Sequence, residues 1–161
     1  MKLFATILIG LVITIHPLRA AEASEKFLAS IRAGCDSQEL DAIKPLYDLS
    51  GTPPDRVGEV LLGWKYMFSD LKKGWTVQEI KYVKKSDFSG LDPNETELAE
   101  NISSSLPQKI AGKTYVLNLD TSGVIRIKLA SPDGKGKQLM MSPVGMRVDG
   151  SLAFASIKEA Q

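Results

Sequence analysis

The sequence predicts an α+β domain in which N-terminal helices pack across a curved antiparallel sheet of about four to five strands. Up to Gly74, apolar residues recur at spacings of three and four, which is the period of an amphipathic helix. After Gly74 the period changes to two, which is the period of a half-buried strand. Helices followed by a run of strands, without alternation between the two, are typical of the α+β class.

An export signal is expected over residues 1–23. A positive charge near the start is followed by an apolar run over 3–15 and by small residues at Ala20, Ala21 and Ala23. The run is shorter than the roughly 20 residues that span a bilayer, and the pattern is that of a cleavable signal peptide. Cleavage is expected after Ala20 or Ala23, which would leave an exported, periplasmic or extracellular chain with no transmembrane anchor. An uncleaved anchor is the alternative.

The remaining residues, 24–161, are expected to form a single domain that begins with three helices. The first is predicted to start at Ser24, a good N-cap residue, and to end at Gly34. The second follows a capping-box pattern over 36–39, and Pro45 should kink or shorten it.

The third helix has the strongest signal of the three. Thr52 is suited to cap it, Pro53 fits its first turn, and Gly74 should end it. An apolar stripe lies between them at helical spacing: Val57, Val60, Leu61, Trp64, Phe68 and Leu71. Such a stripe predicts a helix face that covers a sheet.

The strands are expected to follow one another as an antiparallel meander. They are predicted at 75–85, 113–119, 124–130 and 138–148, with a last strand that contains Leu152 and Phe154 and has Ile157 as a further candidate. A short helix over 95–103 is expected in the polar connection between the first two strands. Residues 124–130 alternate, and one face of this strand is apolar: Ile125, Ile127 and Leu129. Asp149-Gly150 is a strong hairpin signal.

Composition removes most metal-binding and nucleophilic chemistry. The one histidine, His16, lies within the expected export signal, and Cys35 is the one cysteine. Structural zinc takes four nitrogen or sulfur ligands and catalytic zinc three, so no metal is assigned. No cofactor and no catalytic residue are assigned either. Cys35 is expected to be a small buried apolar residue, with a reactive thiol as the alternative.

The charge pattern argues against nucleic acid as a partner. From residue 21 onward the chain holds 18 basic and 19 acidic residues, and the basic residues are dispersed. Residues 105–161 carry eight basic and four acidic residues, whereas the preceding part is acidic. Two faces that attract each other within one fold are the favoured interpretation, and an anionic partner on the C-terminal half is the alternative.

Two groups of segments resemble a known superfamily. Phe27 to Gly34 and Leu40 to Tyr47 are similar to a helix, a short turn with glycine, and a second helix that ends near Leu-Tyr. Ser142 to Gly145, Asp149-Gly150 and Phe154 are similar to last strands with an apolar-Pro-Val-Gly segment, Asp-Gly and an aromatic strand. In this order the chain resembles small exported members of the cystatin-like and NTF2-like α+β superfamily. It departs from NTF2-like proteins because three helices precede its first strand. The resemblance implies a pocket between helices and sheet, but no single function.

The expected function is that of an exported, non-catalytic module that binds a small ligand or a protein through this helix–sheet cleft. Four aromatic residues are the ligand-binding candidates: Trp64, Phe68, Tyr82 and Tyr115. Two alternatives stay open. One is a structural or assembly protein that forms a homodimer through its sheet, and the other is a small acid–base enzyme. The enzyme would need a carboxyl group beside a tyrosine in a dry cleft, and no spacing in the sequence places such a pair together.

Overall fold

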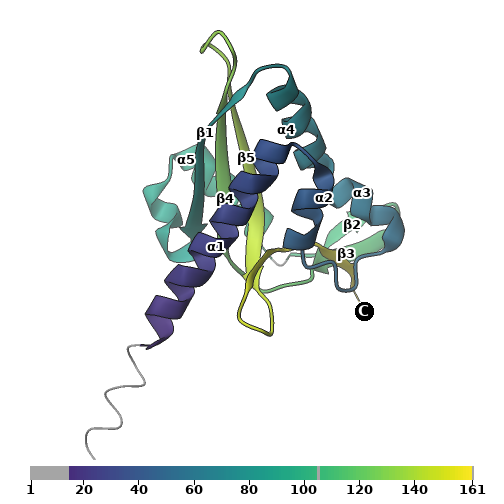
Figure 1. Ribbon diagram of the computed structural model, residues 1–161. Helices are drawn as coiled ribbons and strands as arrows, with labels where there is room; N and C mark the ends of the chain where they lie inside the picture. Colours follow the sequence, from purple (N-terminus) through teal and green to yellow (C-terminus); the bar gives the residue numbers. More distant parts are fainter. Residues whose placement is uncertain (1–14, 105, 161) are drawn as a thin grey trace, which may run out of the picture.

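The computed structural model describes residues 15–104 and 106–160, and it confirms the α+β class (Figure 1). The α-helices are α1 (Ile15–Ser37), α2 (Leu40–Ile43), α3 (Val57–Val60), α4 (Leu62–Lys72) and α5 (Pro93–Ser103). The 3₁₀ helices are η1 (Lys44–Leu46), η2 (Pro54–Arg56) and η3 (Lys85–Gly90). The strands are β1 (Thr76–Lys84), β2 (Gln108–Ile110), β3 (Lys113–Leu117), β4 (Thr121–Ala130), β5 (Lys137–Met146), β6 (Leu152–Phe154) and β7 (Ile157–Glu159).

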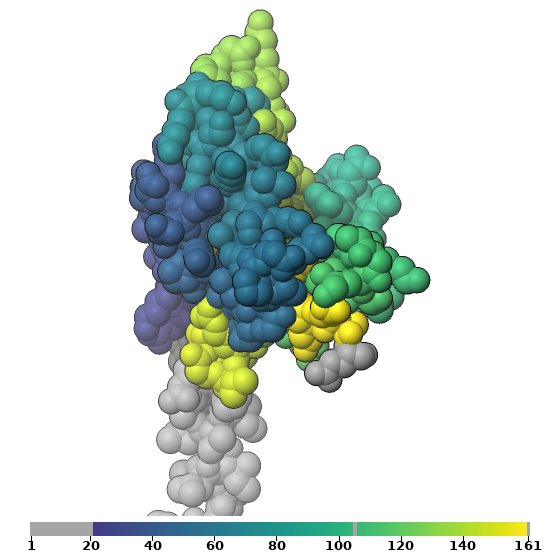
Figure 2. All heavy atoms as spheres, turned by 90° about the vertical axis from the view of Figure 1, so that its right-hand side faces the viewer, coloured from purple at the N-terminus to yellow at the C-terminus, as the bar shows by residue number. Residues whose placement is uncertain are grey.

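The strands form two antiparallel sheets. Sheet A has the order β1-β4-β5-β6, and sheet B has the order β2-β3-β7. The predicted meander is therefore wrong at β3, because β2 and β7 occupy both of its edges and leave none for β4. Sheet B lies beside α3, and the tip of the β4–β5 hairpin projects from the opposite end of the molecule (Figure 2).

Helices cover both faces of sheet A. On one face, α1, α2 and α4 enclose the main core, and on the other face α5 and η3 enclose a smaller one (Figure 1). The alternation predicted for β4 is confirmed. Its odd-numbered side chains join the main core: Ile125, Ile127 and Leu129. Val124 points the other way and joins the smaller core with Val83, Phe88 and Ala99.

The first helix does not end at Gly34. It continues to Ser37, and the chain leaves it at Gln38, which has a φ of 55°. Gly34 is needed instead for close packing, because a Cβ atom there would overlap the Cδ1 atom of Ile43 in α2. The capping box predicted over 36–39 does not form, since its first residues belong to α1.

The third predicted helix is divided into η2, α3 and α4, with a break at Leu61. Thr52 does not cap it, because its hydroxyl is hydrogen-bonded to the hydroxyl of Ser156. Gly74 does end α4, with a φ of 93°, and the Trp75 N–H donates to the Asp70 carbonyl at 3.1 Å. This is the Schellman arrangement that satisfies the last carbonyls of a helix.

A hairpin does form at Asp149-Gly150, since β5 and β6 pair on either side of it, with Met146 opposite Leu152. Its connection is longer than the predicted two residues, because residues 147–151 separate the two strands. Within residues 15–104 and 106–160, none of the helices combines the length and the apolar character needed to cross a membrane.

An ion-pair network joins α5 to sheet A. Arg126 of β4 contacts Glu79 of β1 at 2.6 Å and Glu95 of α5 at 2.7 Å, and Nζ of Lys128 lies 2.7 Å from the other Glu95 oxygen. The side chains of Arg126 and Glu95 are only 11% and 13% exposed. Hydrogen bonds from Lys128 and Arg126 hold the pKa of the Glu95 carboxyl below its usual value.

We expect a Glu95→Gln variant to lose less stability in acid than the wild type. Because folding lowers the Glu95 pKa, its carboxylate stabilises the fold fully above the unfolded-state pKa of about 4.3. That contribution is lost as the pH falls through the lower folded-state pKa. Urea unfolding from neutral to strongly acidic pH would measure it. Glu97→Gln, at an exposed position of α5, is the control and should follow the wild type. Identical acid profiles for Glu95→Gln and wild type would contradict the expectation.

Candidate functional site

Three of the four aromatic candidates border the main core, and the fourth lies apart from it. Trp64 and Phe68 are neighbours on α4, with ring centroids 5.8 Å apart, and both are buried. Tyr82 is a half-buried residue of β1 that packs against the same core, and its hydroxyl donates to a serine of β4 at 2.8 Å. Tyr115 is buried in sheet B, with the Arg56 guanidinium 5.6 Å from its ring centroid. Only Trp64 and Phe68 are in direct ring contact.

Aromatic rings fill the space between the helices and sheet A. Phe154 of β6 is fully buried, and three rings surround it: Phe27 at 5.0 Å, Tyr47 at 4.9 Å and Trp64 at 5.5 Å between centroids. The Trp64 Nε1–H donates to the Tyr47 hydroxyl at 2.9 Å. A ligand that entered here would have to displace these rings, which leaves the surface as the place for a binding site.

Tyr47 and Cys35, two titratable groups of this interior, stay protonated at neutral pH. Burial raises the pKa of the Tyr47 hydroxyl to about 12 and that of the Cys35 thiol to about 11. A general base works best with a pKa near the operating pH, and a reactive cysteine needs a lowered pKa. Both groups are shifted in the opposite direction. Cys35 is buried, as the sequence predicts.

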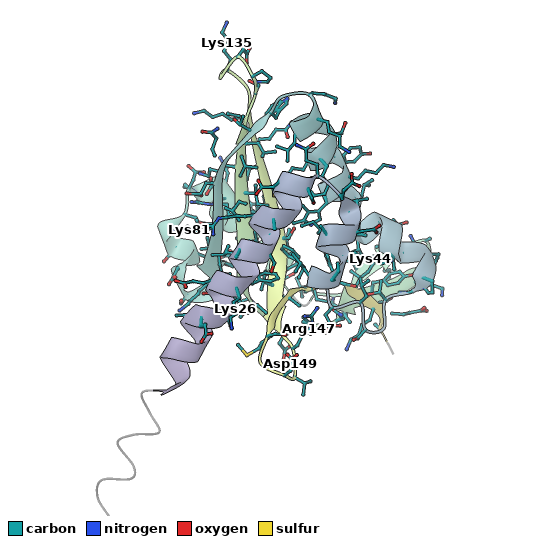
Figure 3. All side chains as sticks on the ribbon, in the orientation of Figure 1. Lys26, Lys44, Lys81, Lys135, Arg147 and Asp149 are labelled. Atoms are coloured by element: carbon teal, nitrogen blue, oxygen red, sulfur yellow. The ribbon has the colours of Figure 1, made fainter. Side chains whose placement is uncertain are left out.

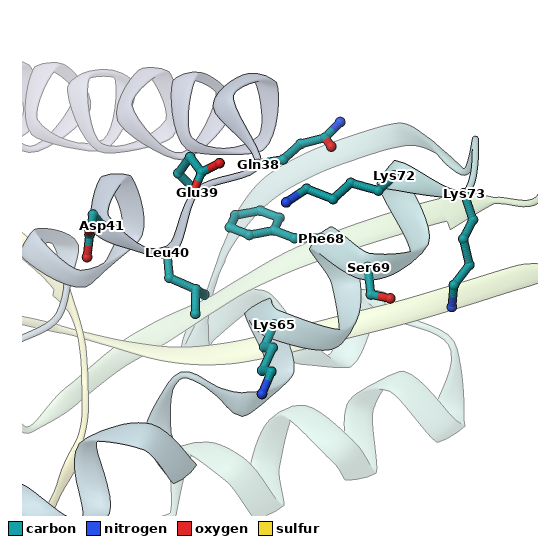
Figure 4. Close-up of a pocket in the computed structure, with 9 residues that line it drawn as sticks. All are labelled: Gln38, Glu39, Leu40, Asp41, Lys65, Phe68, Ser69, Lys72 and Lys73. Carbon is teal, nitrogen blue, oxygen red and sulfur yellow. The ribbon is translucent and has the colours of Figure 1, made fainter.

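A surface groove opens beside Phe68, between α4 and the connection from α1 to α2 (Figure 4). Its volume is about 540 Å³. One wall consists of Gln38, Glu39, Leu40 and Asp41, and α4 supplies Lys65, Phe68, Ser69, Lys72 and Lys73. We call it the α2–α4 groove. The positive φ of Gln38 reverses the chain after α1 and brings the first wall opposite α4.

The two walls of the groove carry opposite charges. Glu39 and Asp41 are exposed on one wall, and Lys65 and Lys72 are exposed on the other. Across the described part of the chain, none of these four forms an ion pair. Lys73 differs, because its Nζ lies 3.1 Å from an aspartate of its own helix. The groove thus offers two carboxylates and two ammonium groups that are not engaged with the protein.

The charged side chains lie on either side of Phe68. Lys72 extends from α4 toward Gln38 and Glu39, Lys65 lies on the other side of the Phe68 ring and is directed away from it, and Asp41 lies at the far end of the first wall (Figure 4). An ammonium group supplies up to three hydrogen-bond donors, whereas a carboxylate only accepts. The groove can therefore hold a ligand that presents a negative group to one wall and a positive group to the other.

Sequence reasoning identified Phe68 but missed the charged walls. Lysines and carboxylates on exposed helix faces have the same pattern whether they line a groove or only face solvent. Glu39 and Lys72 are 33 positions apart in the chain, and they become neighbours only because the chain reverses at Gln38. No local signal in the sequence reports that reversal.

A second, larger cavity of about 720 Å³ lies between β1 and the β4–β5 hairpin. Its charged lining consists of Glu95, Lys128 and Lys137. The first two neutralise each other at 2.7 Å, which, among the described residues, leaves the exposed Lys137 as its unengaged charge. The α2–α4 groove differs because it has unengaged charges of both signs. We therefore take the α2–α4 groove as the candidate site.

Two further findings bear on this site. Among residues 15–104 and 106–160, no three histidine, cysteine, aspartate or glutamate side chains gather where they could hold a metal ion. No protein-family model, no curated protein and no solved structure matches this chain.

Proposed function

We propose that this protein is an exported, non-catalytic binding module whose ligand is a small zwitterion, such as a free amino acid or a short peptide, held in the α2–α4 groove. The observation that carries the proposal is the pair of oppositely charged walls. The ligand carboxylate would lie against Lys65 and Lys72, and its ammonium group against Glu39 and Asp41. An apolar ligand side chain would lie against Leu40 and the edge of Phe68.

The size and exposure of the groove set the expected affinity. Its volume of about 540 Å³ falls within the range of small-molecule sites. Because the charged groups are exposed, each ion pair with the ligand would contribute only about 0.2–1 kcal/mol. Four such contacts and a small apolar contact correspond to a dissociation constant of roughly a millimolar or weaker. The ligand must therefore be supplied at comparable concentrations.

We expect free L-amino acids and dipeptides to shift the backbone amide resonances of the groove in ¹⁵N-labelled protein at about millimolar concentration. Shifts should gather at residues 38–41 and on α4. Lys72→Glu should abolish them, because it replaces one of the two unengaged ammonium groups by a carboxylate. Lys135→Glu makes the same charge change at the far tip of the β4–β5 hairpin and is the matched control (Figure 3). Shifts confined to other surfaces, or unchanged by Lys72→Glu, would contradict the proposal.

Export is supported by the place where the core begins in α1. Residues 21–26 are not buried, and Phe27 is the first buried residue in the part of the helix from residue 21 onward. Ser24 does not cap α1 but lies within it, and its hydroxyl donates to the carbonyl three residues earlier. Both expected cleavage sites, after Ala20 and after Ala23, precede Phe27. Cleavage at either site would remove no side chain that the core is seen to use.

We expect the exported protein to begin between Ala21 and Ser24. Residues 1–14 of the expected signal lie outside the described residues, so this prediction rests on the sequence and on the start of the core. Expression of the full chain in a bacterial host, followed by intact-mass measurement of the exported fraction, would test it. A mass that still includes residues 1–20 would show an uncleaved anchor instead.

A further inference from the structure

Sheet A ends on one side in a long strand with an open edge. β1 pairs with β4, and within the described chain no strand pairs with its other edge. The opposite side of the sheet ends in the three-residue β6, where Tyr47 makes a bridge to Phe154. An open edge presents unpaired backbone N–H and C=O groups that can add another strand.

The neighbouring helix leaves this edge accessible. A groove of about 490 Å³ separates α1 from the first half of β1, and it is lined by Arg32, Cys35, Asp36 and residues 77–80. Lys81 lies on the outer side of β1 and is exposed (Figure 3). In the described chain it forms no ion pair, so its charge is unengaged.

We propose that two copies of this chain pair through their β1 strands, antiparallel and about a two-fold axis at Ile80. The two four-stranded sheets would then form one continuous sheet. Glu79 of each copy would lie opposite Lys81 of the other, which is the self-complementary pattern that a two-fold interface requires. Glu79 is 38% exposed beside Arg126, so its carboxylate can accept a second cation.

The charges of β1 select this register over its neighbours. A two-fold axis perpendicular to the sheet keeps the α1 faces of both copies on the same side of the joined sheet. Residues that lie opposite each other must then point to the same face. Because side chains alternate along a strand, only every second register meets this condition. In the two nearest such registers, Glu79 would lie opposite itself or Lys81 would lie opposite itself. Opposite charges stabilise a cross-strand pair, and like charges destabilise it.

The irregular part of β1 lies outside the centre of the interface. The register with β4 shifts between Val77 and Glu79, which leaves Gln78 as an extra residue. The central pairs of the proposed interface use Glu79, Ile80 and Lys81, which follow the bulge. A bulge increases the local twist and limits the length of regular pairing, so a short, reversible interface is expected rather than an indefinitely growing one.

This inference goes beyond the proposed function and is independent of it, because the α2–α4 groove does not include β1. Cross-linking tests the register directly. The experiment uses a Cys35→Ser background, in which Ile80→Cys places one cysteine of each copy beside the two-fold axis. Cα atoms of opposite residues in antiparallel strands are about 4.5–5.5 Å apart, and a disulfide can bridge this distance. Lys84→Cys, the control, leaves the Glu79 and Lys81 pairs intact but lies far from its counterpart. Covalent dimers should form with Ile80→Cys and not with Lys84→Cys.

Light scattering coupled to size-exclusion chromatography tests the charge pairing. We expect the wild type to give a concentration-dependent dimer, and Lys81→Glu to weaken it about ten-fold or more, because two attractive pairs become repulsive. Lys84→Glu makes the same charge change in β1 outside the central pairs and should leave the dimer intact. A wild type that stays monomeric, a Lys81→Glu variant that dimerises like the wild type, or equal cross-linking of both cysteine variants would overturn the proposal. A monomer that pairs with a foreign extended peptide would overturn it too.

Discussion

A Trp64→Ala variant is expected to lose about 3–5 kcal/mol of unfolding free energy, the range found when a buried aromatic side chain is deleted. Trp64 is 1% exposed, and its ring packs against Phe154 and Phe68. Its removal would leave a cavity and would also take away the N–H that the Tyr47 hydroxyl accepts at 2.9 Å. Urea unfolding followed by far-ultraviolet circular dichroism would measure the change.

Tyr66→Ala is the matched control for this variant. Tyr66 is on the same helix but is 64% exposed, so its truncation should change the unfolding free energy by less than about 0.5 kcal/mol. A loss below about 1 kcal/mol for Trp64→Ala would contradict the description of a filled interior. It would instead indicate that the space between the helices and sheet A opens readily, as the helix–sheet cleft of the sequence prediction requires.

Gly123→Ala is expected to cost about 3 kcal/mol for the opposite reason, the addition of an atom where there is no room. Gly123 lies in β4, opposite Lys84 of β1. A Cβ atom there would overlap the backbone oxygen of Val83 and would lie 2.8 Å from the Tyr82 ring. A backbone oxygen cannot rotate away, so β1 would have to shift along part of its length. Chemical denaturation of the purified variant would give the loss.

Gly58→Ala is the control for the added methyl group. In α3 no heavy atom outside its own helix lies within 4 Å of the position of its Cβ. Alanine is preferred over glycine in helices by up to about 1 kcal/mol, so this variant should be as stable as the wild type or more stable. If Gly123→Ala matched the wild type as well, the close contact between β4 and β1 would not be a constraint on the fold.

The sequence predicts those elements whose cause lies within a few residues. The alternation in β4 and the end of α4 at Gly74 are of this kind. The sequence-based prediction is wrong where a contact with a residue far along the chain determines the local structure. Gly34 has the local pattern of a helix end, but glycine is needed there because Ile43 of α2 packs closely against it. Thr52 has the pattern of an N-cap, but its hydroxyl is bonded to Ser156, 104 positions away.

The division into two sheets could not be predicted for a similar reason. β2, β6 and β7 have three residues each, which is too short for a periodic pattern to be recognised. Without β2 and β7, nothing in the sequence shows that both edges of β3 are already occupied. The pattern of residues 113–119 alone is equally consistent with pairing to β4.

For the candidate site, periodicity predicted the direction of side chains but not the space around them. Trp64 and Phe68 point to the core, as their spacing indicates. Whether that core encloses a cleft depends on Phe154, which lies far along the chain and fills the space. The resemblance to cystatin-like and NTF2-like proteins, with the pocket that it implies, stays a prediction.

Residues 152–159 complete both sheets. β6 adds to sheet A and β7 to sheet B, while Ser156 between them donates its N–H to the Asn118 side chain at 2.8 Å. During synthesis, therefore, neither sheet can close until this short segment has left the ribosome. Domains dominated by such non-local pairing fold in milliseconds to seconds. The order of folding thus differs from the order of translation. The N-terminal helices are synthesised first, but the sheet surface on which they pack is complete only after the last strands have been made.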